Sequence, residues 1–293
     1  MKRVNIVTSN PYNRYPFRYL SEVACTYLSN FAECTVDTRP RPGSLNVVLH
    51  DTLFAERYLR AGEVAWLDTP LVISSFKKHW SRLYVCSRFE ARELEELGVE
   101  VDGVAPRPVH PELLVDEDVE KKFDVLVFSK FYVYDRKNVR LAYESLRKVR
   151  CRSAFATDAP FIPNRVRYGS MSEADKRRLY KSSRFLLHIP SSEGFGMPVL
   201  ESMASGTPVI YSGIPVLKEY AVGVEVPVDG YEVVGTIEGR MHRWIVRERD
   251  VVESIEYALS LDEDAYRRLS TQSRLRALDI VNSFTQWIKS IAD

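Results

Sequence analysis

One short segment of the sequence combines glycines, a proline and two carboxylates in an order that suits the binding of phosphate and sugar. We expect a buried strand to end at Pro190, a glycine-bearing turn to span Glu193–Gly196, and a helix to open at Pro198. Backbone N–H groups at such an opening bind anions, because glycine lets a ligand approach the chain closely. Glu201 follows one helical turn later, where a carboxylate can accept hydrogen bonds from a sugar or ribose diol. The alternative is an ordinary strand–turn–helix in which Glu193 is a solvated turn residue.

The same segment also matches a long family signature. Glu193 and Glu201 flank Gly-Phe-Gly-Met-Pro, and Met-Ala-Ser-Gly-Thr-Pro-Val-Ile follows. This pattern resembles the signature of retaining GT-B glycosyltransferases, specifically the large family four, the glycosyl transferases group 1. The resemblance implies that Glu193 faces the donor sugar and that Glu201 holds the nucleotide ribose. It further implies that four consecutive backbone groups contact the sugar and the diphosphate: Gly194, Phe195, Gly196 and Met197.

The resemblance extends upstream to basic residues that would neutralise the donor diphosphate. The family has a basic pair after the first strand of its second domain, which in this sequence ends at Ser129. Lys137 matches the family lysine and is expected to contribute to catalysis. Lys130 stands where the family has arginine, and an ammonium neutralises phosphate without the bidentate fork, so Arg136 is a candidate to supply the guanidinium. The alternative for all three is a solvated basic loop.

A third element of the resemblance concerns the nucleobase. Tyr168–Ser172 is similar to the family loop whose backbone meets the base, and Ser172 is also a good helix N-cap on its own merits. Backbone contacts carry no side-chain code, so the donor remains UDP-, GDP- or ADP-linked.

The first half of the chain offers fewer candidates. His50 closes a strand, at the edge where an α/β sheet presents ligand-binding groups, and the resemblance implies that it touches the donor sugar. A competing alignment offers His79, and a hydrogen-bonded structural histidine is the third possibility for His50. The remaining histidines, His110, His188 and His242, are expected to be structural or exposed.

The loop after the first strand departs from the family pattern. Family members carry a glycine-rich turn there, whereas Ser9–Arg18 contains no glycine. We therefore expect side chains such as Arg14, Tyr15 or Arg18 to line the acceptor side.

Strands and helices alternate along the chain, which is typical of parallel α/β architecture. Strands are expected at Val4–Thr8, Cys34–Asp37, Leu45–His50, Leu71–Ser75, Leu83–Ser87, Asp102–Ala105, Phe123–Ser129, Cys151–Ala156, Val166–Gly169, Phe185–Pro190, Pro208–Tyr211 and Val222–Val228. Helices are expected around Tyr19–Tyr27 and at Leu53–Ala61, Phe89–Leu97, Val139–Val149, Ser172–Lys181, Met197–Ala204 and Val251–Asp293. The region from Gly230 to Asp250 is expected to be irregular.

A proline-rich segment divides the chain into two domains. Three prolines within Pro106–Pro111 forbid a helix and favour a stiff, extended connection, so we place a hinge at 106–112. The resulting prediction is an acceptor domain over 1–112, joined by a C-terminal helix over 281–293, and a donor domain over 113–280. The resemblance implies the GT-B fold, in which two Rossmann-like domains with parallel sheets face each other across a cleft and the C-terminal helix crosses back to the first.

Composition excludes several other classes of protein. The 293 residues carry a formal charge of +1, which argues against a dedicated nucleic-acid binder. The four cysteines form no CxxC pair, so a disulfide framework is not expected and a reducing cytoplasm is the simpler location. No apolar run reaches the length of a membrane span, and only Phe76–Trp80 hints at membrane contact. Arg outnumbers Lys 29 to 12 and glutamine is nearly absent, which favours a thermophilic source.

The resemblance implies a retaining, metal-independent glycosyltransferase, a hexosyltransferase of class EC 2.4. It would move a sugar from a nucleotide sugar to a hydroxyl acceptor, which is a glycan, a lipid or a small molecule, without a cofactor; no oligomeric state is predicted. Two alternatives stay open. A non-catalytic nucleotide-sugar-binding partner subunit is motivated by the altered first loop, and a Rossmann dehydrogenase is disfavoured because no GxGxxG follows Val4–Thr8.

Overall fold

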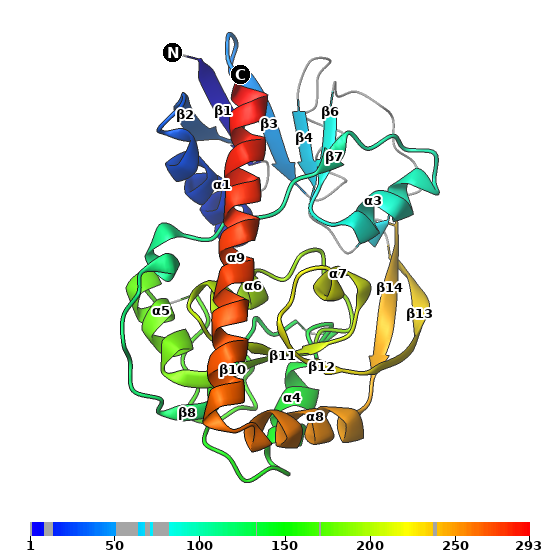
Figure 1. Cartoon of the computed structure of the whole chain (residues 1–293). Coiled ribbons are helices and arrows are strands. Elements are labelled where there is room, and N and C mark those ends of the chain that lie inside the picture. The colour runs from blue at the N-terminus through cyan, green and yellow to red at the C-terminus, as the bar shows by residue number, and fades with distance from the viewer. Residues whose placement is uncertain are drawn as a thin grey trace. The chain divides into compact units, whose positions relative to one another are not determined.

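The chain folds into two compact units, each built on a sheet of parallel strands (Figure 1). A computed structural model describes residues 2–8, 14–50, 64–67, 71–72, 82–132, 134–169, 171–236 and 239–293. Unit 1 comprises Met1–Pro108, Val234–Met241 and Ile280–Asp293, and unit 2 comprises Val109–Val233 and His242–Asp279. The chain first passes from unit 1 to unit 2 after Pro108, inside the proline-rich segment.

Unit 1 is organised around a six-stranded sheet with the order β2-β1-β3-β4-β6-β7. Its strands are β1 (Arg3–Thr8), β2 (Glu33–Asp37), β3 (Leu45–His50), β4 (Val64–Leu67), β6 (Arg82–Val85) and β7 (Gly103–Val104). All of the neighbouring pairs are parallel. The described helices α1 (Arg14–Leu28) and α3 (Arg88–Glu95) follow β1 and β6. The predicted parallel α/β class is therefore confirmed.

Strand β4 was not expected from the sequence, although it lies at the centre of this sheet. Val64–Leu67 is buried throughout, so it has neither the length nor the alternation that marks a half-exposed strand. Its Trp66 anchors the unit: the indole N–H donates to the carbonyl of Ala105 at 3.1 Å, and the ring packs 4.8 Å from that of Trp287. Trp287 belongs to helix α9 (Glu263–Ala292), whose residues from Ile280 onward group with unit 1.

Unit 2 is organised around a five-stranded sheet with the order β12-β11-β10-β8-β9. Its strands are β8 (Phe123–Phe128), β9 (Ser153–Ala156), β10 (Ser183–His188), β11 (Val209–Ser212) and β12 (Gly223–Val226). The described helices of the unit are η1 (Pro111–Leu114), α4 (Val139–Leu146), α5 (Glu173–Lys181), α6 (Met197–Ala204), α7 (Pro215–Lys218) and α8 (Glu248–Ser260), together with the first half of α9. The central strands β8, β10 and β11 are buried on both faces, so each reads as a nearly continuous apolar run.

Two predictions for this half of the chain are wrong. Val166–Gly169 is not a strand, since Val166 makes only an isolated bridge to Ala156. The supposedly irregular region contains β13 (Val228–Thr236) and β14 (Gly239–Val246), which pair in a three-stranded sheet with β5 (Leu71–Val72). Only two residues separate β13 from β14, so the two strands form an antiparallel hairpin. Glycines and exposed charged residues in both strands conceal the apolar alternation on which strand prediction depends.

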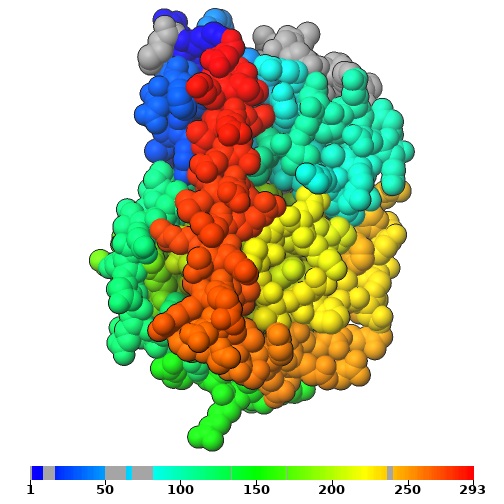
Figure 2. Space-filling view, in the orientation of Figure 1, coloured from blue at the N-terminus to red at the C-terminus, as the bar shows by residue number. Residues whose placement is uncertain are grey.

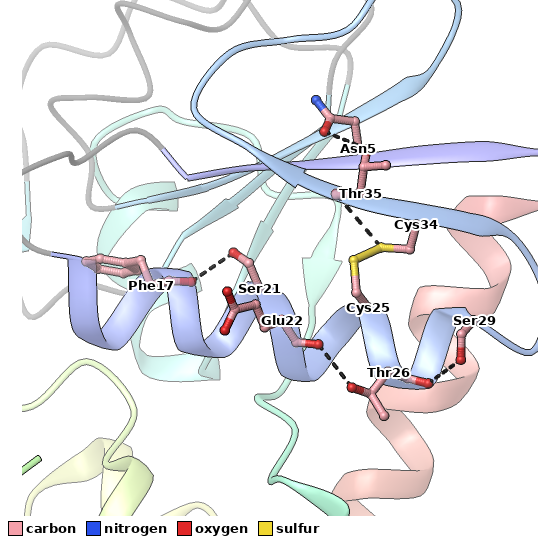
Figure 3. Close-up of a disulfide and its surroundings, with 9 residues drawn as sticks. All are labelled: Asn5, Phe17, Ser21, Glu22, Cys25, Thr26, Ser29, Cys34 and Thr35. Atoms are coloured by element: carbon pink, nitrogen blue, oxygen red, sulfur yellow. Dashed lines mark hydrogen bonds between the residues drawn. A yellow bond between two sulfur atoms is a disulfide. The ribbon is translucent and has the colours of Figure 1, made fainter. Parts of the chain in front are cut away.

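A disulfide joins Cys25 of α1 to Cys34 of β2, although no disulfide framework was expected from the sequence (Figure 3). The two residues are nine apart in sequence, and the turn between helix and strand brings their Cα atoms to 5.4 Å. This separation lies inside the range that a disulfide spans. Asn5 of β1 extends the link, because its side-chain oxygen accepts a hydrogen bond from the Thr35 hydroxyl at 3.0 Å. The bridge therefore fastens α1 to the edge strand of the sheet.

We predict that replacing Cys25 and Cys34 together with serine lowers the stability of the protein. Closing a loop of this size restricts the unfolded chain and contributes roughly 2–3 kcal/mol. The measurement is urea unfolding of the oxidised protein and of the double variant. Cys151→Ser, which removes a free thiol, serves as the control and should leave the midpoint unchanged. Equal midpoints for the double variant and the oxidised parent would contradict the prediction.

Candidate active site

The candidate site lies at the carboxyl edge of the unit 2 sheet, where the loops after β8 and β10 meet. The two strands are parallel neighbours, so their chains leave the sheet at the same edge. The Ser191 N–H donates to the carbonyl of Arg136 at 2.8 Å, and the Asn138 side-chain amide donates to the carbonyl of Ile189 at 2.9 Å. Two hydrogen bonds thus fasten the basic loop to the glycine-rich loop.

Local backbone geometry fixes the basic residues within this loop. Asp135 caps α4, because its carboxylate accepts from the N–H of Val139 at 2.8 Å and of Arg140 at 3.0 Å. Asp135 and Asn138 both have left-handed backbone angles, with φ of 40° and 52°. Such residues carry a conformational cost that the surrounding structure must offset. The turn between them carries Arg136 and Lys137.

Three side chains gather around Glu193, whose own side chain is only 8% exposed. Lys137 Nζ donates to Glu193 Oε2 in a close ion pair. Arg136 NH1 lies 3.7 Å from Glu193 Oε1 and donates to the carbonyl of Ser192 at 2.9 Å. His188, the last residue of β10, places Nε2 3.3 Å from Glu193 Oε2. We call these four residues the Glu193 cluster: Arg136, Lys137, His188 and Glu193.

Burial and like charge set the protonation of the Glu193 cluster. Burial lowers the pKa of His188 well below its ordinary value, and the nearby charges of Lys137 and Arg136 lower it further. His188 is therefore neutral at neutral pH. Burial also lowers the pKa of Lys137, with Arg136 adding to the effect. With Lys137 protonated, two cations face one carboxylate, so the cluster has a surplus positive charge available to an anion.

The glycine-rich loop is held in one shape by Tyr220. Its hydroxyl donates to the carbonyls of Phe195 and Gly196 at 2.7 and 2.9 Å, and its ring stacks on that of Phe195 with the centroids 4.8 Å apart. Gly196 adopts a φ of +96°, and a Cβ there would lie 2.8 Å from Leu217 Cδ2. Both the conformation and the space require glycine.

Helix α6 opens directly after this loop. Its N-cap is Gly196, which has no side chain to bond the first amides, and Pro198 occupies the first turn. Gly194 directs its N–H at the Glu193 carboxylate, 3.3 Å from Oε1. The helix N-terminus and the Glu193 cluster therefore adjoin one another, and both favour negative charge.

A second buried acid lies in the first turns of α6. Lys176 Nζ is 3.1 Å from Glu201 Oε1 and 3.0 Å from Glu173 Oε1, and the Tyr180 hydroxyl donates to Glu201 Oε2 at 3.1 Å. Burial raises the pKa of Glu201 although Lys176 opposes the shift. Burial alone would lower the pKa of Lys176. The negative charges of Glu201 and Glu173 and their hydrogen bonds have a larger combined effect, so the pKa of Lys176 is raised. Helix α5 thus holds the Glu201 carboxylate in a fixed orientation.

The remaining predicted site residues are placed as follows. Lys130 lies with its ammonium 5.4 Å from the Tyr132 ring centre, whereas Arg136, Lys137 and His188 contact the Glu193 carboxylate. Ser172 is the N-cap of α5, as predicted, and accepts from the Asp175 N–H at 3.1 Å. His50 ends β3, but its side chain and the whole of His79 lie outside the described part of the chain.

The first loop is described only in part. Residues 9–13 and the side chains of Arg14 and Tyr15 lie outside the described part. Arg18 belongs to α1 and forms an exposed ion pair with Glu22 at 2.8 Å. The prediction that these side chains line the acceptor side stays a prediction.

Sequence reasoning missed three residues of the site. His188 was expected to be structural or exposed, yet it lies against Glu193; its position at the carboxyl end of a buried parallel strand is the signal that could have identified it. Lys176 and Tyr180 occupy adjacent turns of α5, and their contact with Glu201 depends on how α5 packs on α6. A single sequence carries no direct signal of that packing.

The described side chains include no group of three or more His, Cys, Asp or Glu residues arranged to hold a metal ion. No helix in the described part of the chain is both long enough and apolar enough to span a membrane.

Comparison with known sequences finds similarity to glycosyltransferases. The model of the family glycosyl transferases group 1 matches residues 161–234, which include the Glu193 loop and α6. A protein assigned as glycosyltransferase 48 of Sulfolobus islandicus filamentous virus is 29% identical over 220 residues, covering 72% of this chain and 70% of the relative. A second protein of that virus, assigned as glycosyltransferase 41, is 29% identical over 216 residues, covering 72% of this chain and 65% of the relative. The chain thus spans about two thirds of the length of these relatives.

Comparison with solved structures shows the fold. The structure of Anabaena HepE in complex with UDP and glucose superposes with a TM-score of 0.68 over 100% of both chains, at 13% sequence identity. At this identity the similarity concerns the arrangement of the elements alone.

We predict that Lys176→Met strongly destabilises the protein. The substitution leaves Glu201 buried without its cationic partner, and removing one partner of a buried ion pair costs about 3 kcal/mol or more. Lys218→Met is the matched control, because Lys218 is 51% exposed and pairs with Glu225 at the surface. That change should stay within about 0.5 kcal/mol. Chemical denaturation measures both variants, and comparable losses of stability would argue against a buried Lys176–Glu201 pair.

Proposed function

We propose that this chain, which belongs to the glycosyl transferases group 1 and has the GT-B fold, transfers a hexose from a nucleotide sugar to a hydroxyl acceptor with retention of anomeric configuration. The observation that carries the proposal is the Glu193 cluster. A buried carboxylate paired with two cations lies beside a glycine-rich helix opening, and a second buried carboxylate, Glu201, follows on the same helix.

The cations and the helix opening act on the donor diphosphate. In the reaction the bond from the anomeric carbon to the diphosphate oxygen breaks, and its electron pair passes to that oxygen. Lys137, Arg136 and the first amides of α6 are preorganised to stabilise the developing charge. The acceptor oxygen then bonds to the anomeric carbon on the face that the diphosphate leaves, and its proton passes to the departing diphosphate. We propose that no metal takes part, since side chains and helix amides supply the positive charge.

The two carboxylates orient opposite ends of the donor. Glu193 would accept hydrogen bonds from hydroxyls of the sugar, and Glu201 from the ribose diol. Lys176 and Tyr180 keep the Glu201 carboxyl group in a fixed orientation for this purpose. His50, at the end of β3, is kept as a proposed contact of the donor sugar. Neutral His188 helps to hold the Glu193 carboxylate in place through its 3.3 Å contact.

The donor nucleotide, the cellular location and the kind of source organism are proposed from separate observations. HepE binds UDP, so UDP-sugars are the first donors to test, with GDP- and ADP-sugars as alternatives. We propose a cytoplasmic protein of a thermophile. The high ratio of Arg to Lys and the Cys25–Cys34 disulfide both support this origin, because intracellular disulfides persist in hyperthermophiles.

The experiment that tests the function screens UDP-, GDP- and ADP-hexoses with the purified protein. We expect one donor to raise the melting temperature of the protein. Hydrolysis or transfer of that donor should yield a product with the anomeric configuration of the donor, read from the anomeric proton by NMR.

Glu201→Ala should weaken binding of that donor by about tenfold or more, because two charge-assisted hydrogen bonds to the ribose are lost.

Glu253→Ala, an exposed helix substitution on α8, is the control and should bind the donor normally. Inverted product would refute retention. Unchanged donor affinity in Glu201→Ala would remove the ribose role, and a protein that neither binds nor turns over any of the donors would refute the function.

We further predict that donor affinity falls as the pH rises. The buried Lys137 has a lowered pKa, so it loses its proton at a lower pH than an ordinary lysine, whereas a nucleotide-sugar diphosphate stays ionised throughout. Binding therefore weakens as Lys137 becomes neutral. Lys137→Arg keeps its charge and should flatten the profile, and the exposed Lys148→Arg should leave it unchanged. Calorimetric titration measures the profiles, and a wild-type affinity that does not change with pH would contradict the role of Lys137.

A further inference from the structure

The β13–β14 hairpin presents a group of aromatic rings at the surface of unit 2. The Tyr231 ring centre lies 4.6 Å from that of His242 and 4.7 Å from that of Trp244, so the three rings occupy one face of the hairpin. Tyr231 is 51% exposed. In Figure 2 the amber atoms of the hairpin region lie at the surface beside the yellow atoms of β12 and α7. We call Tyr231, His242 and Trp244 the hairpin face.

The hairpin face is connected directly to the candidate donor site. The Trp244 N–H donates to the carbonyl of Ser191 at 2.7 Å, and Ser191 precedes Glu193 by two residues. The Ser191 N–H in turn donates to the carbonyl of Arg136. A backbone link therefore runs from the hairpin to the loop that carries the Glu193 cluster.

Two further rings lie close to the same loop. Tyr132 lies 5.7 Å from Tyr134, which is 61% exposed, and Arg136 lies 5.0 Å above the Tyr132 ring. The guanidinium of Arg136 also donates to the carbonyl of Ser192. Aromatic rings from two separate elements thus border the loop at Ser191–Glu193.

The charges around the hairpin face decide between kinds of ligand. Arg243 lies 3.5 Å from Glu232, and Arg247 pairs with Asp229, so two of the three arginines in 239–247 are matched by carboxylates and only Arg240 remains. An anionic lipid surface or a nucleic acid would need unmatched positive charge. Aromatic faces that are flanked by polar side chains can bind a neutral ligand with one apolar face and hydroxyl groups around it. A pyranose ring has this character, because its axial C–H groups pack on an aromatic face while its hydroxyls reach the polar edge.

We propose that the hairpin face binds pyranose units of a carbohydrate acceptor, so that unit 2 contributes to acceptor recognition as well as to donor binding. That the bound sugar is the acceptor follows only if the proposed function is correct. That the hairpin face binds a sugar does not depend on the proposed function. The hairpin thereby selects a glycan among the possible classes of hydroxyl acceptor.

The test is saturation-transfer NMR with methyl α-D-glucopyranoside, methyl α-D-mannopyranoside, methyl α-D-galactopyranoside and maltotriose as probes, in the absence of donor. The wild-type protein is expected to transfer saturation to the ring protons of at least one probe. Tyr231→Ala should weaken that binding by about fivefold or more, because it removes one stacking surface, whereas Tyr231→Phe should retain it. Tyr257→Ala is the matched control, since Tyr257 is 60% exposed on α8, and it should bind like the wild type.

Three outcomes would overturn the inference: saturation of no probe by the wild-type protein, equal binding by Tyr231→Ala, or sedimentation with phosphatidylglycerol vesicles that is lost in Tyr231→Ala. Donor binding separates this inference from the proposed function. Tyr231→Ala should give the wild-type shift in melting temperature with the nucleotide sugar. If the protein binds sugar through Tyr231 but binds no nucleotide-sugar donor, the proposed function is refuted and the sugar-binding role of the hairpin face is retained.

Discussion

The buried charge of Glu193 is the constraint on which the site depends. A carboxylate that is withdrawn from water must be compensated, and Lys137 and Arg136 supply the compensation. With Lys137 protonated, these two cations exceed the charge of one carboxylate, and His188, which burial and their charges keep neutral, adds none. In that protonation state the cluster carries a surplus positive charge. Under the proposed function, this surplus would stabilise a diphosphate, whose negative charge grows as its bond to the sugar breaks.

The fold of unit 2 serves to bring these charges together. Parallel β8 and β10 end at one edge of the sheet, and each is followed by a loop with constrained backbone: left-handed Asp135 and Asn138 in one, left-handed Gly196 in the other. Hydrogen bonds between the loops then lock the cations against the acid. The hairpin is bonded to the same loop through Trp244, which makes it a natural place for a specificity element.

The sequence alone predicted the parts of the fold that have strong local signals. The apolar runs of β3, β8 and β10 and the proline-opened α6 stand close to their predicted bounds. Central strand β4 was missed because four fully buried residues show no periodicity, and the hairpin was missed because glycines and charges mask its alternation. At the site, Glu193, Lys137 and Arg136 stood out through their pattern, and the structure brings them together. His188, Lys176 and the Cys25–Cys34 bridge arise from tertiary packing, which one sequence does not encode locally.

The central claim is that Glu193 and an anionic ligand share the same cations. Its most direct test is the calorimetric affinity of UDP, or of whichever nucleoside diphosphate the protein binds best, for the wild type and for Glu193→Gln at one pH. Neutralising the carboxylate frees Lys137 and Arg136, so the account predicts that the variant binds the nucleoside diphosphate at least as tightly as the wild type while sugar transfer is lost. Weaker binding of the nucleoside diphosphate by Glu193→Gln would contradict it.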